Sequence, residues 1–188
     1  MSTGRIEYVE QLKIPSESTC ILLCGVSNSG KSTFAKKWFD HNNVVSSDEI
    51  LLELLELYPS FSFMNYSAIQ NEAFDTFWDT IFSKAGSNFL VIDTMCVNYA
   101  YRKELIDFTR NFFKNIILIV FDIKLEEIMS RPKKDYGRNL PVTYSQEDIP
   151  ANHADLVRQL NSTMIFDGVD IVYFLNSDTI DKVSIEFD

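Results

Sequence analysis

Two hydrophobic periods alternate along the chain. Short apolar runs, of the length of buried strands, occupy residues 20–23, 43–46, 88–93, 116–122 and 170–175. Between them, apolar residues recur every three or four positions and predict helices over 31–39, 67–85, 98–113, 125–131 and 145–160, with another starting at 49. Residues 11–15 and 183–187 show the pattern of edge strands. This alternation predicts an α/β fold, a three-layer sandwich with a mainly parallel sheet and helices on both faces.

The predicted helix over residues 67–85 carries an apolar stripe. Ser67 is a suitable N-terminal cap for it, and residues 58–66, which are rich in aromatics, predict a loop. The stripe consists of Phe74, Phe77, Trp78, Ile81 and Phe82. Its spacing is typical of a helix face that packs into a core, and a platform for stacking nucleic-acid bases is the alternative.

The bulk properties are those of a single cytoplasmic domain spanning residues 1–188. A net charge of −10 argues against a general nucleic-acid coat protein, although a locally basic cleft stays compatible with it. We expect no membrane span and no secretion signal, because the apolar runs are short and the N-terminus is polar. Cys20 and Cys24 are too far apart along one strand to pair, so we expect reduced thiols, with Cys96 inert.

The strongest local motif lies between the first apolar run and the first helix. Residues 25–32 read G-V-S-N-S-G-K-S, which matches the phosphate-loop pattern G-x-x-x-x-G-K-[ST]; a plain glycine turn is the alternative. Glycines let backbone N–H groups surround an anion, and the following helix adds its positive dipole end. In this motif Lys31 binds the β- and γ-phosphates and Ser32 ligates Mg²⁺. We therefore expect ATP and Mg²⁺ as cofactors, bound by Gly25, Ser27, Asn28, Ser29, Gly30, Lys31, Ser32 and Thr33.

Two carboxylates follow apolar runs at positions that a parallel sheet brings to one rim. We expect Asp48, after the 43–46 run, to accept the proton of an acceptor hydroxyl; capping the next helix is its alternative role. We expect Asp93, at the end of the 88–93 run, to belong to the metal site by holding a Mg²⁺-bound water or orienting a cation. Simple solvation of a strand end is the alternative there. Asp122 has a similar position and a weaker case.

Positive charge concentrates in residues 131–138 of an otherwise acidic chain. The segment holds four cations and one acid: Arg131, Lys133, Lys134, Arg138 and Asp135. Prolines and a glycine punctuate it, which predicts a hinged lid over residues 131–143 that covers the γ-phosphate and excludes water. A solvated surface run is the alternative interpretation.

Together these parts favour a kinase over other phosphate-loop proteins. The sequence contains no guanine motif N-K-x-D and lacks the arms of large motor ATPases. A small phosphotransferase needs a donor cradle, a carboxylate for the acceptor hydroxyl and a cationic lid, and the chain offers all three. The expected catalytic residues are Asp48, Lys31, Arg131 and Arg138. His41 and His153 lack metal-ligand spacing, so we expect a surface or capping role for each.

The order of the motifs resembles the 5′-OH polynucleotide kinases, most closely the kinase domain of bacterial RNA-repair polynucleotide kinase/phosphatase. The resemblance rests on GVSNSGKSTFAKKWF, VVSSDEI, FLVID followed by Arg102, Arg131 with the stretch 138–141, and YFLNSD. It implies ATP-dependent phosphorylation of a 5′-hydroxyl on RNA or DNA. It also implies functional roles for Lys31 and Ser32 (ATP and Mg²⁺), Asp48 (general base), Asp93 (support of the site), and Arg131 and Arg138 (nucleotide and transferring phosphate).

Three sites depart from that family's usual pattern. Leu51 stands where the family typically has an arginine near the acceptor phosphate. Met95 and Cys96 replace a preferred Thr-Asn pair, and Asp135 replaces a lid arginine. A kinase for nucleosides or other small hydroxyl compounds, and a non-catalytic nucleotide-binding module, therefore stay open as alternatives.

Overall fold

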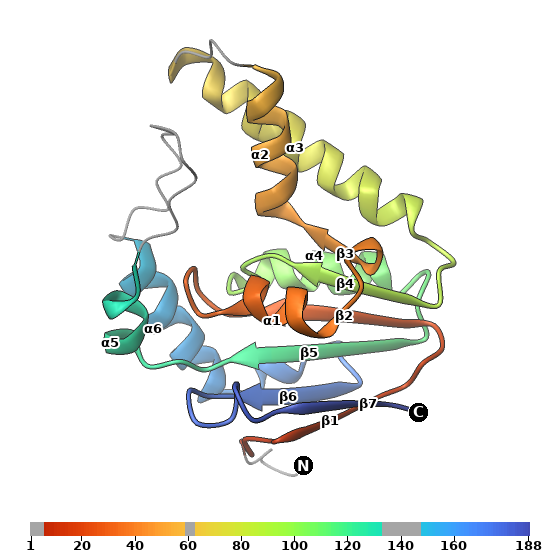
Figure 1. The fold of residues 1–188 in the computed structure, drawn as a ribbon, viewed down its shortest axis with the longest axis vertical. Helices are drawn as coiled ribbons and strands as arrows, with labels where there is room; N and C mark the ends of the chain where they lie inside the picture. Colours follow the sequence, from red (N-terminus) through yellow and green to blue (C-terminus); the bar gives the residue numbers. More distant parts are fainter. Residues whose placement is uncertain (1–5, 59–62, 133–147) are drawn as a thin grey trace.

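The main sheet consists of five parallel strands. A computed structural model describes residues 6–58, 63–132 and 148–188. The strands are β2 Thr19–Cys24, β3 Val44–Ser46, β4 Phe89–Asp93, β5 Asn115–Phe121 and β6 Ile171–Leu175. They lie in the order β3-β4-β2-β5-β6, and all neighbours run parallel (Figure 1). The predicted α/β fold with a mainly parallel sheet is confirmed.

The two central strands explain why the sequence pattern was so clear. Every residue of β2 and all but the first of β5 are buried. Parallel strands that are covered on both faces read as continuous apolar runs and do not alternate with polar residues. Because right-handed crossovers return each strand in the same direction, the carboxyl ends of all five strands meet at one rim of the sheet.

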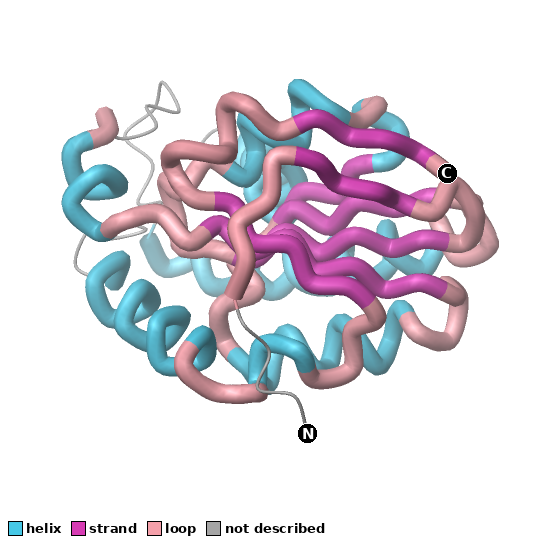
Figure 2. The backbone as a smooth tube through the Cα atoms, turned by 90° about the horizontal axis from the view of Figure 1, so that it is seen from below, coloured by secondary structure: helices cyan, strands magenta, loops and turns pink. Residues whose placement is uncertain are grey.

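Helices cover both faces of this sheet. They are α1 Lys31–Trp38, α2 Ser47–Leu57, α3 Phe63–Ser83, α4 Tyr99–Thr109, α5 Leu125–Ser130 and α6 Asp148–Leu160, with short 3-10 turns η1 His41–Asn43 and η2 Met164–Phe166. In Figure 1, α1 lies in front of the sheet and α4 behind it, and Figure 2 shows the strands between the helices. Helices α2 and α3 pack against each other and project together beyond the sheet (Figure 1).

Helix α3 differs from its prediction in two ways. It already includes Phe63, so Ser67 lies inside the helix and is not its cap; residues 59–62 of the expected loop are outside the described residues. The stripe is also only partly core, because 48% of Phe74 and 60% of Phe82 is exposed. Instead, the Phe74 ring packs against Tyr101 of α4. The Phe82 ring packs against Phe112, just beyond α4, with 5.8 Å between the two ring centroids.

The two expected edge strands are present, and they pair with each other. Strands β1 Gln11–Ile14 and β7 Ser184–Phe187 form a separate parallel two-stranded sheet. The hydroxyl of Tyr173 on β6 donates to the carbonyl of Lys13 at 2.6 Å, which ties this small sheet to the main one. The pairing joins the two ends of the chain and could not be read from either segment alone.

The buried apolar side chains form one continuous core. All three cysteines are free thiols inside it. In the described part of the chain, no helix combines the length and the apolar character that crossing a membrane requires.

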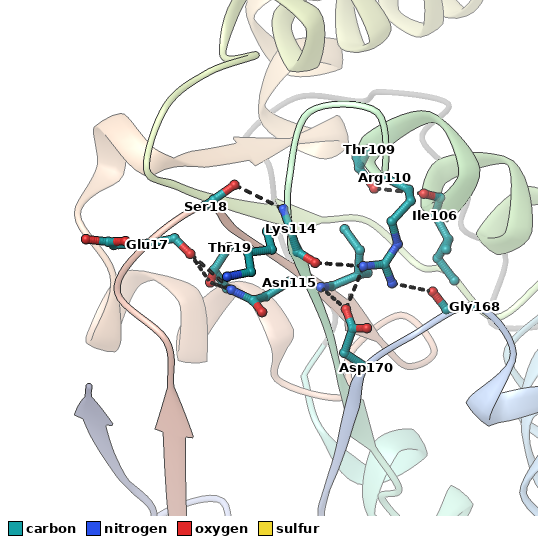
Figure 3. Close-up of polar contacts among 11 residues, drawn as sticks. Glu17, Ser18, Thr19, Ile106, Thr109, Arg110, Lys114, Asn115, Gly168 and Asp170 are labelled. Carbon is teal, nitrogen blue, oxygen red and sulfur yellow. Dashed lines mark hydrogen bonds and ion pairs between the residues drawn. The ribbon is translucent and has the colours of Figure 1, made fainter.

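An ion pair fastens the sheet at the edge opposite the carboxyl-end rim (Figure 3). Arg110, which follows α4, donates from Nη1 to Asp170 Oδ2 at 2.7 Å and from Nη2 to the Gly168 carbonyl at 2.8 Å. The same Asp170 oxygen accepts from the backbone N–H of Ile116 at 2.7 Å. The contacts therefore tie α4 to the starts of β5 and β6.

We expect Asp170→Asn to lower stability by about 1 kcal/mol at pH 7, a value that allows for solvent screening of this half-exposed pair. Burial alone would raise the pKa of Asp170, but the hydrogen bonds from Arg110 and Ile116 and the charge of Arg110 lower it below its ordinary value. A depressed folded-state pKa contributes stability that is present above the unfolded-state value, near pH 4, and lost as the pH falls.

Urea unfolding of the wild type and of Asp170→Asn at pH 7 and at pH 3 measures this contribution. The difference between their free energies of unfolding should be smaller at pH 3. An equal difference at both pH values would contradict a stabilising role for the Asp170 carboxylate.

Candidate active site

The phosphate loop joins β2 to α1 at the carboxyl-end rim. Two glycines shape it. A Cβ on Gly25 would lie 2.8 Å from Ser29 Oγ and 2.9 Å from Phe121 Cβ, so no side chain fits there. Gly30 has φ +106°, a left-handed conformation that favours glycine, and it immediately precedes the first turn of α1. Both glycines therefore stand where a side chain would be excluded or strained.

The remaining loop residues fit an anionic ligand. Asn28 also has a positive φ of 67°, and the N–H of Ser29 that follows it donates to the Val26 carbonyl at 3.2 Å, which closes a tight turn in the loop. The buried hydroxyl of Ser29 has no hydrogen-bond partner within the described structure, so it is an orphaned polar group at the loop. Ser27 is half-buried and Thr33 is exposed on the first turn of α1. A phosphate group would supply the acceptor oxygens that such a loop lacks.

Lys31 lies folded into the loop. Its Nζ donates to the carbonyls of Gly25 at 2.8 Å and Val26 at 3.0 Å, and the side chain is buried. Burial lowers the pKa of Lys31, and the negative charges of Asp93 and Asp48 oppose that shift. Both predicted carboxylates thus act on the same ammonium group, although they are 45 positions apart in the sequence.

Strand register explains how Asp93 reaches the loop. It pairs with Leu23 at the end of β2 on one side and with Ser46 at the end of β3 on the other. Asp93 is buried, and it lines a pocket of about 120 Å³ together with Ser32. The structure brings together the hydroxyl and the carboxylate that the sequence predicts as the metal site. Oxygen ligands of these two kinds suit Mg²⁺.

The same pocket contains side chains that the sequence analysis did not assign to the site. They include Lys36 and Glu49, which form an ion pair at 2.9 Å, and His41 and Ser46. Glu49 follows Asp48 directly, but nothing in the sequence indicates that the α2 start and α1 face one cavity. Within the described residues, this pocket included, no three His, Cys, Asp or Glu side chains gather as a metal cluster.

Asp48 lies in the first turn of α2, which begins two residues earlier than expected. The cap of α2 is Ser46, whose hydroxyl accepts from the Glu49 N–H at 3.4 Å, so the capping role considered for Asp48 is wrong. Asp48 also acts on Tyr66 of α3: burial raises the pKa of Tyr66, a hydrogen bond with Gln70 lowers it, and the charge of Asp48 raises it further. Tyr66 was expected in a loop, and the structure places it instead on α3, within the electrostatic influence of Asp48.

The predicted lid is described only at its start. Arg131, at the end of α5, donates from Nη1 to the carbonyl of Asn28 at 2.9 Å, so its guanidinium lies on the phosphate loop. A Cβ on Gly30 would be 3.6 Å from the same Nη1. Arg138 and the rest of the lid from residue 133 are outside the described residues.

Asp122 plays a different part from the other two strand-end carboxylates. Its Oδ2 accepts from the hydroxyl of Tyr8, which lies in the segment before β1. Burial and the Asp122 carboxylate raise the pKa of Tyr8 to about 12. His153, on α6, has its Nε2 3.0 Å from the Ile123 carbonyl, in keeping with a packing role.

We expect Gly25→Ala to destabilise the protein by about 1–3 kcal/mol, because the added methyl group overlaps Ser29 and the buried Phe121. ATP affinity should fall with it, since the loop must shift. Thermal unfolding and calorimetric titration measure the two effects. Gly86→Ala is a suitable control: its φ of +85° strains any side chain, but nothing lies within 4 Å of the new Cβ. Equal ATP affinity for both variants would contradict the close approach at Gly25.

Comparisons with known proteins agree with this fold. A family model described as an AAA domain matches residues 20–160. Similar solved structures include a candidate kinase from Chloroflexus aurantiacus, with a TM-score of 0.51, 14% identity, and coverage of 86% of this chain and 89% of that chain. A protein of the PezAT toxin–antitoxin system of Streptococcus pneumoniae has a TM-score of 0.50, 16% identity, and coverage of 88% and 71%.

A shikimate kinase from Acinetobacter baumannii, in complex with shikimate, has a TM-score of 0.49 and 16% identity and covers 89% of this chain and 87% of its own. The sequence matches no curated protein. At these identities the first two structures establish a common kinase-like phosphate-loop fold and nothing finer.

Proposed function

The chain belongs to the AAA domain family, and from this premise we propose that it is an ATP-dependent phosphotransferase that moves the γ-phosphate to a hydroxyl group. One observation carries the proposal. Ser32 and Asp93 line one pocket with Ser46 and Glu49 at the start of α2, and Asp48 lies in the same first turn, so a donor site and a candidate base share the carboxyl-end rim. The charges of Asp93 and Asp48 also act on the phosphate-loop lysine, Lys31.

The donor side of the site fits ATP with Mg²⁺. The loop N–H groups and Lys31 would hold the β- and γ-phosphates, and Ser32 and Asp93 would hold the metal ion. Bound Mg²⁺ would neutralise charge on the phosphate oxygens. Lys31 must leave the two loop carbonyls to which it now donates, and a phosphate oxygen is the stronger acceptor that can draw it away.

The acceptor side depends on Asp48 and Arg131. Asp48 would accept the proton of the attacking hydroxyl, which raises the nucleophilicity of that oxygen. Arg131, already on the loop, would stabilise negative charge on the transferring group, with Arg138 as a further cation from the lid. The predicted catalytic set is therefore Lys31, Asp48, Arg131 and Arg138.

The sequence leaves two classes of acceptor, a nucleic-acid end and a small hydroxyl compound, and the distribution of charge near Asp48 distinguishes between them. The resemblance to polynucleotide kinases supports a 5′-OH end of RNA or DNA. A specific observation favours the second class, a small hydroxyl compound without phosphates: residues 47–83, which include α2 and α3, contain seven acidic residues and no Lys or Arg. An acidic hairpin beside Asp48 repels a polyanion, and Leu51 offers no charge to a phosphate.

Transfer assays decide between these acceptors. The protein is incubated with γ-labelled ATP, Mg²⁺ and 5′-OH oligonucleotides of RNA and DNA, and in parallel with nucleosides, sugars and amino alcohols. Label on an oligonucleotide supports the polynucleotide acceptor. Release of ADP stimulated only by a small alcohol supports the second class. ATP binding with no turnover on any acceptor, unaffected by Asp48→Ala, would overturn the kinase proposal and leave a nucleotide-binding module.

A further inference from the structure

One buried cation has no role in the site described so far. Arg102, on α4, is only 1% exposed. Its Nη1 donates to the carbonyls of Cys96 at 2.8 Å and Val97 at 3.4 Å. Its Nη2 donates to Gln159 Oε1 at 2.6 Å and to the carbonyl of Met164 at 3.3 Å. The guanidinium thus donates hydrogen bonds to three separate parts of the chain.

All of these acceptors are neutral. Within residues 6–58, 63–132 and 148–188, no ion pair joins Arg102 to a carboxylate. A guanidinium keeps its proton under all physiological conditions, so the positive charge persists in the core. Burying such a charge without a counterion costs several kcal/mol, and structures tolerate it only where something offsets the cost. The hydrogen bonds offset part of this cost, and the ring of Tyr99, whose centroid is 5.8 Å from Arg102 Cζ, offsets another part, but neither supplies a negative charge.

The segment that Arg102 holds is the neighbour of the phosphate loop. The N–H of Gly25, the first loop residue, donates to the Met95 carbonyl at 3.1 Å. Cys24, one residue earlier, donates from Sγ to the Cys96 carbonyl at 3.3 Å. Cys96 itself has φ +50°, an unfavourable conformation for a residue with a side chain, so surrounding contacts must maintain it. Arg102 supplies two of those contacts.

The charge of Arg102 also reaches the loop. Arg102 Nη1 lies 4.0 Å from Cys24 Sγ. Burial raises the pKa of the Cys24 thiol, and Arg102 and Lys31 are the two cations that oppose that increase. Cys24, the residue directly before the loop, therefore lies in the electrostatic field of Lys31 in the loop and of Arg102 on α4.

We propose that Arg102 is a positioning residue for the nucleotide phosphates. It holds residues 95–97 against Gly25, and its charge, which no carboxylate pairs with in the described residues, is balanced when a polyphosphate enters the loop. This inference rests on the proposed nucleotide binding and goes beyond it, because Arg102 would act through residues 95–97 and through its charge. It predicts that neutralising Arg102 weakens binding in proportion to the number of phosphates, an effect that a purely structural residue would not produce.

A matched pair of variants at Gln159 tests the charge without removing Arg102. Gln159→Glu places a carboxylate where Oε1 now accepts from Arg102. Gln159→Met carries no charge. Both lose the donation from Gln159 Nε2 to the Val97 carbonyl at 2.7 Å, so local damage is common to the two. Calorimetric titrations with ATP, ADP and AMP, each with Mg²⁺, give the affinities, and thermal unfolding confirms that each variant is folded.

Relative to Gln159→Met, we expect Gln159→Glu to bind ATP about tenfold more weakly and AMP no more than about threefold more weakly. Equal ATP-to-AMP affinity ratios in the two variants would overturn the inference and leave the proposed function intact. Wild-type protein that binds none of the three nucleotides would overturn both.

Arg102→Lys and Arg102→Met provide the same comparison if Gln159→Glu does not fold. Lysine keeps the charge and loses the fork-shaped set of donors. The lysine variant should keep the wild-type ratio of ATP to AMP affinity, and the methionine variant should lose it. If the ratio of ATP to AMP affinity falls equally in the lysine and methionine variants, only the hydrogen-bond geometry of Arg102 matters. That result would overturn the electrostatic part of the proposal.

Discussion

Lys31→Met should bind ATP at least about 10²-fold more weakly than wild type and show no acceptor-stimulated ADP release. Lys31 is the buried cation of the phosphate loop, and its ammonium group is within the field of both candidate carboxylates. Methionine has a similar length and flexibility but no charge, so the loop keeps its packing and loses its positive centre. The two carbonyls that Lys31 now bonds would be left to water or to neighbouring donors.

Calorimetric titration with ATP and Mg²⁺ measures the first effect, and a coupled ADP assay measures the second. Lys37→Met is the matched control, because it removes the same charge from an exposed position on the same helix, where Lys37 lies over the Trp38 ring. ATP affinity of the control should stay within about twofold of wild type, as expected for an exposed charge. Retention of wild-type affinity by Lys31→Met would rule out the loop as the ATP site.

Asp48→Asn should lower turnover by about 10²-fold or more while ATP affinity changes little. Asparagine keeps the shape of the side chain and cannot accept the proton of an acceptor hydroxyl. The helix start should be preserved, because Ser46 and not Asp48 caps α2. A loss in kcat without a loss of binding is the signature of a group that acts in the chemical step.

Glu53→Gln on the same helix is the control for this variant. Glu53 is exposed, and its substitution changes the net charge by the same amount. We expect turnover of the control close to wild type with whichever acceptor proves active. If Asp48→Asn and Glu53→Gln have the same turnover, Asp48 is not the base, and the carboxylate must be sought among the other side chains at the rim.

The local parts of the site were predictable because they are continuous in sequence. The phosphate loop uses eight consecutive residues, in which Gly30 has a left-handed conformation and Gly25 leaves no space for a side chain. The parallel sheet was equally clear, since fully covered strands such as β2 and β5 are apolar throughout. Asp93 could be assigned to the rim because it ends such a run.

The predictions were less accurate for α3, because an apolar helix face can pack either against the sheet or against another helix. The aromatic stripe of α3 indicated a buried face, yet Phe74 and Phe82 pack sideways against aromatic side chains of and beside α4 and stay half exposed. Periodicity states which residues share a helix face, and it does not state how much of that face the sheet covers. The start of α3 was also missed, because aromatic residues near a proline resemble a loop in the sequence, whereas the helix already begins at Phe63.

The parallel α/β sheet, the phosphate loop and the strand-end positions of the candidate carboxylates follow from the amino-acid sequence, because each depends on neighbours along the chain. Which of these residues meet depends on the packing of distant segments. Strand register placed Asp93 between Leu23 and Ser46, and it brought Asp48 into the field of Lys31. The pairing of β1 with β7 and the enclosure of Arg102 by residues from three segments likewise join distant parts of the chain. Such contacts form only when the whole chain packs, since the free energy that holds them comes from burial and not from local conformation.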